Sequence, residues 1–282
     1  MSNRKKRRID QLLVERGYFV SRERAKRSLM AGVVFYEGRR IEKPGTLVDP
    51  DGEIRVKEDP CSFVSRGGLK LEAALKEFDI TVKGRVALDC GASTGGFTQC
   101  LLRWGAKMVY AVDVGYGQLA WELRQDPRVI VLERTNLRYL TPEQLGTRVD
   151  LVTLDLSFIS LTKVFAAVRE LLTSTGEVIA LVKPQFEAGP QLVGKGGIVR
   201  DPDIHRQVLL KTIQKAIESG YQYKGVTYSP VRGTDGNIEF LLSLALSLTS
   251  DQMELQDNYE SDVCAVIEKA HYVLIEQHRK RC

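Results

Sequence analysis

The chain has 282 residues, of which 43% are hydrophobic and 27% charged, a composition typical of folded globular proteins. Its length exceeds the ~150 residues of an average domain and favours two domains. The longest apolar stretch, Phe240 to Leu248, is far shorter than the roughly 20 residues of a membrane span. The basic N-terminus leads into no apolar secretion signal, and five scattered cysteines indicate reduced thiols rather than disulfides or a metal site. We therefore expect a cytoplasmic protein with no membrane contact and no metal.

Positive charge is concentrated near the N-terminus. Residues 1–40 contain 12 Lys and Arg against 4 Asp and Glu, whereas the remaining 242 residues contain 29 against 32. The net charges of these two parts are therefore +8 and −3. A local excess of this kind usually binds a polyanion, because contacts between Lys or Arg and phosphates release condensed counterions. The alternative is a basic surface that is only solvated.

The first elements after this basic start have the pattern of a small domain. Residues 8–16 carry apolar side chains at helical spacing, and Gly17 ends this helix. Ser21 is a favourable N-cap for a second helix, RERAKRSLMA, in which Ala25 and Leu29 face inward. The stretch VVFY-EG-RRI then predicts two strands joined by a two-residue turn.

Two short basic helices followed by a hairpin resemble an S4 RNA-binding domain, over about residues 7 to 60. The resemblance implies that folded RNA is recognised through its shape and its phosphates. The basic side chains of the N-terminal arm and the second helix are the candidate RNA contacts: Arg4, Arg7, Arg22, Arg24, Lys26 and Arg27.

A break in periodicity at KEDPCSFVSRGG separates this domain from the rest of the chain. We expect an S4-like domain over residues 1–60 and a linker over 61–68. A larger domain over 69–250 and a C-terminal helical extension over 251–282 follow.

The larger domain alternates strand and helix patterns, which predicts a doubly wound, mostly parallel α/β sheet. The expected strands lie near 85–89, 108–112, 129–132, 149–155, 177–182, 223–228 and 238–246. The last two strands are joined by PVRGTDGN, which is too short for a crossover helix, so they should pair antiparallel. Seven strands with an antiparallel last strand are typical of Rossmann-like class I methyltransferases.

The stretch LDCGASTGGF follows the first of these strands. Asp89 ends the strand, and Gly91 and Gly95 let the backbone turn tightly and approach a ligand. A P-loop is excluded because GASTGGFT contains no lysine; a dinucleotide site is weakened, but left open, because Ser93 replaces the second glycine of its fingerprint. S-adenosylmethionine, which has a carboxylate, a ribose and an adenine but no phosphate, fits this turn. We expect contacts to that cofactor from Asp89, Gly91, Ser93 and Gly95.

Two further cofactor contacts are expected at the ends of the second and third strands. Asp113 lies 22 residues after Gly91, the spacing of a carboxylate that accepts hydrogen bonds from ribose hydroxyls. The alternative is a solvated turn aspartate. Asn136 follows the third strand and is a candidate for the adenine edge, although asparagine is also a common turn former.

The acceptor of the methyl group is inferred from the fourth and fifth strands. The motif N/D-P-P-Y/F, usual in transfer to base amino groups, is replaced by LDLSFISL, and the pair Pro60–Cys61 lies in the linker, away from a nucleophile position. A hydroxyl acceptor remains. Asp155 and Lys183 end these strands at the edge where α/β sheets bind ligands, and such a lysine can orient or deprotonate a ribose 2′-hydroxyl. A rim lysine balanced by Asp155 is the alternative.

Seven motifs closely resemble the TlyA group, rRNA 2′-O-methyltransferases that also carry a haemolysin label and are relatives of FtsJ-type enzymes. They are GGLKLEAAL, LDCGASTGGF, DVGYGQLAW, ERTNL, LDLSFISL, LVKPQFE and GNIEF. The resemblance implies a Lys-Asp-Lys-Glu catalytic tetrad, which Lys70, Asp155, Lys183 and Glu239 match. It also implies S-adenosylmethionine as cofactor, a cytidine ribose of ribosomal RNA as acceptor, and ribosomal subunits as partners. The rivals are a ribosome-assembly factor with an inactive methyltransferase fold and a membrane-active haemolysin.

Overall fold

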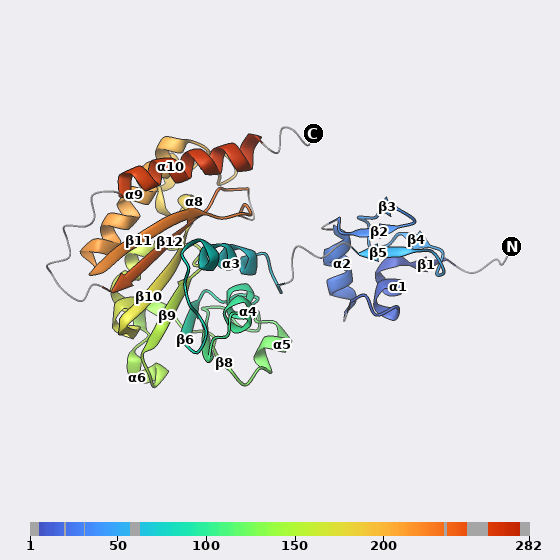
Figure 1. Cartoon of the computed structure of the whole chain (residues 1–282), viewed down its shortest axis with the longest axis horizontal. Helices are drawn as coiled ribbons and strands as arrows, with labels where there is room; N and C mark the ends of the chain where they lie inside the picture. The colour runs from blue at the N-terminus through green and yellow to red at the C-terminus, as the bar shows by residue number, and fades with distance from the viewer. Residues whose placement is uncertain are drawn as a thin grey trace. The chain divides into compact units, whose positions relative to one another are not determined.

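The computed structural model describes residues 6–19, 21–30, 32–56, 63–233, 236–246 and 259–276. The chain divides into two compact units, Met1–Ser62 and Phe63–Cys282 (Figure 1). Each unit has its own hydrophobic core, so each is described by itself.

The N-terminal unit packs two helices against short antiparallel strands. Its helices are α1 (Ile9–Glu15) and α2 (Arg22–Met30), and its strands are β1 (Arg7–Arg8), β2 (Val34–Tyr36), β3 (Arg39–Arg40), β4 (Leu47–Val48) and β5 (Ile54–Val56). β1 pairs with β4, and β2 lies between β3 and β5. The predicted hairpin is confirmed: Glu37 and Gly38 both have positive φ, 48° and 74°, as a two-residue turn of this kind requires.

The second unit is built on a seven-stranded sheet whose order is β11-β12-β10-β9-β6-β7-β8. Its strands are β6 (Val86–Cys90), β7 (Met108–Val112), β8 (Val129–Leu132), β9 (Val149–Leu154), β10 (Leu172–Val182), β11 (Tyr221–Tyr228) and β12 (Phe240–Leu246). β6 to β10 are parallel, and β12 runs antiparallel to both β10 and β11. The predicted α/β class and the antiparallel last strand are thus confirmed.

Helices cover both faces of this sheet (Figure 1). One face packs with α3 (Gly67–Glu77), α4 (Gly96–Arg103) and α5 (Trp121–Arg124), and the other packs with α7 (Phe165–Leu171), α9 (Pro202–Glu218) and α10 (Tyr259–His271). The short elements are α6 (Pro142–Leu145), α8 (Pro184–Glu187), η1 (Leu137–Tyr139), η2 (Leu161–Lys163), η3 (Pro190–Leu192) and the π-helical η5 (Tyr272–Glu276). Side chains alternate along each strand, so Ala87 packs in the core on the face of α3, α4 and α5, whereas Leu88 packs in the core on the face of α7, α9 and α10.

The topology brings four chain segments to one edge of the sheet. Parallel β6, β9 and β10 end there, and antiparallel β12 begins there because Phe240 pairs with Val182. Glu239 therefore lies beside Lys183, although 55 residues separate them in the sequence. The amide of Asp155 donates to the carbonyl of Cys90 at 2.9 Å, which places Asp155 next to the turn that starts at Gly91.

Candidate active site

A cavity of about 220 Å³ opens at this edge. All four residues of the predicted tetrad line it: Lys70, Asp155, Lys183 and Glu239. The glycine-rich turn forms another wall, with Gly91, Ala92, Ser93, Thr94 and Gly96, and Ser65 and Arg66 close the side nearest α3. A larger hollow of about 580 Å³ lies at the opposite edge, beside Arg148, Leu172 and Leu246, where no tetrad residue reaches.

The tetrad consists of two ion pairs. Lys183 Nζ lies 2.7 Å from Asp155 Oδ1, and Lys70 Nζ lies 2.5 Å from Glu239 Oε2. Both lysine side chains are only 11% exposed, and that of Glu239 is 3% exposed. Burying a charge is costly unless it is paired, so each carboxylate stabilises the lysine that it holds. Lys183 has a further partner, since its Nζ donates to Ser157 Oγ at 2.9 Å.

Local packing requires glycine beside two of these residues. A Cβ on Gly68, in the first turn of α3, would lie 2.1 Å from the ring of Phe63, so only glycine lets the chain enter the helix that carries Lys70. A Cβ on Gly233 would lie 2.5 Å from Glu239 Oε1. Reasoning from residue types finds Asp155 and Lys183 but not Lys70 and Glu239, which only the family resemblance predicts.

The glycine-rich turn is shaped by positive φ angles. Gly91 has φ 84°, and a Cβ there would lie 2.4 Å from the carbonyl oxygen of Asp155. Gly95 has φ 95°, and a Cβ there would lie 2.2 Å from Leu123 Cδ1. Ser93, between them, is also left-handed with φ 47°. Larger residues at either glycine would displace backbone or core atoms, so the turn keeps its open backbone.

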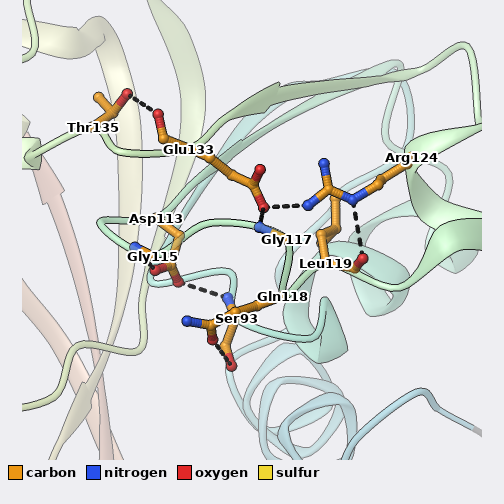
Figure 2. Close-up of polar contacts among 9 residues, drawn as sticks. All are labelled: Ser93, Asp113, Gly115, Gly117, Gln118, Leu119, Arg124, Glu133 and Thr135. Atoms are coloured by element: carbon orange, nitrogen blue, oxygen red, sulfur yellow. Dashed lines mark hydrogen bonds and ion pairs between the residues drawn. The ribbon is translucent and has the colours of Figure 1, made fainter.

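Asp113 fixes the outer side of this turn, as Figure 2 shows. Its carboxylate accepts from the amide of Ser93 at 2.8 Å and from that of Gly115 at 2.7 Å. A second acid behind it, Glu133, accepts from the amide of Gly117 at 2.8 Å and forms an ion pair with Arg124 (Figure 2). The carboxylates of Asp113 and Glu133 therefore hold the loop after β7 in place by accepting hydrogen bonds from its backbone amides.

Two of the expected cofactor contacts, Asp89 and Asn136, make hydrogen bonds within the fold. Asp89 is fully buried; it accepts from Thr98 Oγ1 at 2.6 Å and from Thr153 Oγ1 at 3.2 Å, and burial raises its pKa to about 7. Its carboxyl group joins α4 to β9 and does not line the cavity. Asn136 caps η1 by accepting from the amide of Arg138 at 3.1 Å. Their assignment as cofactor contacts stays a prediction.

One exposed aromatic residue in the loop after Asp155 was not found by sequence reasoning. Phe158 is 91% exposed, has φ 64°, and its ring centroid lies 5.1 Å from that of Phe186 on α8. An aromatic residue within the stretch LSFIS would be expected from the sequence to be buried in the core. Its exposure depends on a left-handed backbone that no residue type signals.

The predicted RNA contacts of the N-terminal unit are partly paired. Arg7 forms an ion pair with Glu15, and Arg22 Nε donates to Asp10 Oδ2 at 2.8 Å. Arg8, which was not predicted, donates to the same buried carboxylate at 3.0 and 3.1 Å. Burial alone would raise the pKa of Asp10, but hydrogen bonds from the two arginines outweigh it and lower that pKa. Lys26 is half-buried; Arg4 and the side chains of Arg24 and Arg27 lie outside the described residues.

The sheet order, the glycine-rich turn and the cavity at the strand ends define a Rossmann-like class I methyltransferase fold. Residues 63–246 match the family of FtsJ-like methyltransferases, and residues 7–54 match the S4 domain. The chain belongs to the FtsJ-like methyltransferase family and carries an N-terminal S4 domain.

Two relatives and a solved structure match between 84% and 98% of the chain. A Bacillus subtilis (strain 168) protein, provisionally named rRNA methyltransferase YqxC, is 52% identical over 97% of both chains. The 16S/23S rRNA (cytidine-2′-O)-methyltransferase TlyA of Mycobacterium tuberculosis is 50% identical over 84% of this chain and 89% of its own. The solved structure of a Streptococcus thermophilus protein, provisionally named a hemolysin, superimposes with a TM-score of 0.77. The two sequences are 42% identical, and the match covers 98% of this chain and 99% of the other.

The hemolysin name also occurs among the relatives. Hemolysin A of Brachyspira hyodysenteriae is 40% identical over 83% of this chain and 98% of its own. Among the helices in the described ranges, none has the length and apolar character needed to span a bilayer.

Proposed function

We propose that the chain transfers a methyl group from S-adenosylmethionine to the 2′-hydroxyl of a cytidine ribose in ribosomal RNA. The observation that carries this proposal is the pair of buried lysine-carboxylate contacts in one cavity with the glycine-rich turn. A relative that is 50% identical carries the name of this activity. Ribosomal RNA as substrate would place the protein in the cytoplasm.

The turn fits the proposed cofactor by its chemistry. The walls formed by Gly91, Ser93 and Gly96 offer backbone amides and small side chains but no cation for a phosphate. Asp113, whose carboxylate already accepts from two amides, has acceptor capacity left for ribose hydroxyls. S-adenosylmethionine, once bound, supplies an electrophilic methyl group on a sulfonium.

The ion pairs suit a hydroxyl acceptor. Transfer to a 2′-oxygen forms an O–C bond and breaks the S–C bond, which leaves S-adenosylhomocysteine, and the proton of the hydroxyl passes to solvent water. Lys183, the residue directly after β10, lies at the cavity and would contact the 2′-oxygen, while Asp155 and Ser157 hold its Nζ in place. Lys70 and Glu239 form the second wall and keep the charge of the cavity balanced.

A residual positive charge in the cavity favours an RNA acceptor. Because the two lysines are matched by two carboxylates, Arg66 leaves the lining with a net charge of +1. In the described part of the chain Arg66 forms no ion pair. A 2′-hydroxyl always lies next to a phosphodiester, which such a guanidinium can bind. The exposed ring of Phe158 offers a stacking surface for a base.

The proposal is tested by transfer of labelled methyl from S-adenosylmethionine to purified ribosomal subunits, followed by mapping of ribose methylation. One 2′-O-methylated cytidine per labelled subunit is the expected result. Absence of label on every subunit and on free rRNA, with the cofactor still bound, would favour a ribosome-assembly factor instead.

A further inference from the structure

The loop that follows β9 is fastened to α8 at three successive points. We name residues 155–160 the acceptor loop. Lys183, just before α8, contacts Asp155 and Ser157; Phe186 contacts Phe158. The third contact comes from the last residue of α8, Glu187, which holds the end of the loop.

Glu187 makes two hydrogen bonds that close the acceptor loop. Its Oε2 accepts from Ser160 Oγ at 2.5 Å, and its Oε1 accepts from the amide of Leu161 at 2.8 Å. The residue is 8% exposed, and burial raises the pKa of its carboxyl group. Burying a charged carboxylate to link two segments costs more desolvation free energy than burying a neutral side chain that accepts the same hydrogen bonds.

The conformation of the acceptor loop needs such a link. Phe158 is not a glycine and yet has a left-handed φ of 64°, while its ring is 91% exposed. A strained backbone of this kind persists only where surrounding contacts determine it, and it is common at functional sites. The exposed ring buries almost nothing of its own, so the contacts at both ends of the loop must hold it.

The same loop also sets the direction of Lys183. Nζ of this lysine donates to Asp155 and to Ser157, which are two residues apart in the loop. A shift of the loop end would move Ser157 and turn the Nζ group. Glu187 lies one helical turn after Lys183, so α8 fixes both the lysine and the loop that orients it.

We propose that Glu187 is a positioning residue for methyl transfer: it holds the acceptor loop so that Ser157 stays against Lys183 and Phe158 stays exposed beside Phe186. The proposal rests on the proposed function. Glu187 lines neither the cavity nor the cofactor turn, so it acts through the acceptor loop.

The test is a double-mutant cycle between Glu187→Ala and Ser157→Ala in the full chain. We expect each single change to lower kcat on ribosomal subunits by on the order of 100-fold, the cost of misplacing a reacting group by about 1 Å. The double variant should lose little more than the worse single variant, because both changes release the same lysine. Affinity for S-adenosylmethionine, measured by calorimetry, should stay as in wild type.

Matched variants separate positioning from stability. The Glu187→Gln variant should keep most of the wild-type kcat. The amide oxygen of the glutamine can still accept from the amide of Leu161, and its NH₂ group can donate to Ser160 Oγ. Glu177→Gln removes a half-buried carboxylate in the middle of β10, which forms an ion pair with Arg85 and does not line the cavity, and should leave kcat unchanged. If Glu187→Ala does not fold, Ser160→Ala removes one of the two bonds and takes its place in the cycle.

Fully additive losses, or a wild-type kcat in the Glu187→Ala variant, would overturn the positioning role. A wild-type protein that transfers no methyl group at all would instead refute the proposed function on which the role rests. The two failures are therefore distinguishable in one series of assays.

Discussion

The clearest prediction on stability concerns a pair of histidines that joins α9 to α10. His205 is fully buried; its Nδ1 lies 3.0 Å from His271 Nε2, and its Nε2 lies 3.2 Å from the carbonyl oxygen of Val199. Because a carbonyl only accepts, His205 Nε2 carries the hydrogen and His205 Nδ1 accepts from His271. A protonated His205 would carry a charge in this buried site, and it could keep the link only if His271 moved its own hydrogen from Nε2 to Nδ1.

Burial, and then the neighbouring His271, lower the pKa of His205 from its ordinary value of 6.5 to about 4. Since the unfolded chain takes up the proton more readily, the stabilisation is complete above pH 6.5 and is lost as the pH falls towards 4. This change of pKa corresponds to about 3 kcal/mol in the free energy of unfolding. His205→Gln, which cannot titrate, should therefore lack this part of the acid sensitivity.

The assay is urea unfolding of wild type and His205→Gln from pH 7 to pH 4, followed by tryptophan fluorescence. Both tryptophans, Trp104 and Trp121, lie in the second unit, so the signal reports that unit. Taking the difference between the two proteins cancels other titrating groups, including Asp89. A difference in unfolding free energy that stays constant over this pH range would refute the reasoning.

Three further predictions concern the proposed activity. Lys183→Ala should lower methyl transfer by at least ~100-fold in the subunit assay and leave cofactor affinity nearly unchanged; wild-type turnover would remove Lys183 from the mechanism. Asp113→Ala should weaken cofactor binding by roughly tenfold, because the amides of Ser93 and Gly115 lose their acceptor, and unaltered affinity in calorimetry would contradict the ribose assignment. Arg24→Gln with Arg27→Gln should weaken subunit binding and reduce its salt slope by about 2, which a salt titration measures; an unchanged slope would mean that these side chains are only solvated.

Much of the fold is encoded in local patterns of the sequence. The strands follow from apolar runs, and the turn after β6 follows from three glycines in six residues. The rule that parallel strands end at one edge is enough to bring Asp155 and Lys183 together. These features depend only on neighbours in the chain or on one rule of topology.

The remaining parts of the site depend on tertiary contacts. Glu239 reaches the cavity only because β12 inserts between β10 and β11, which residue types do not reveal. The burial of Asp89 also depends on the fold: β6 continues to Cys90, so Asp89 lies within the strand, and its side chain is fully buried. The exposure of Phe158 and the closing role of Glu187 arise from a loop whose geometry is fixed by distant partners.

The insertion of β12 between β10 and β11 determines when, during synthesis, the four residues of the tetrad can come together. The contact between Lys70 and Glu239 spans 169 residues, and contacts of such long separation form late because they close a large loop. During synthesis the glycine-rich turn, Asp155 and Lys183 leave the ribosome well before Glu239 does. The tetrad therefore cannot be assembled on a nascent chain that has not reached β12, so the site becomes complete only after most of the sheet has been synthesised.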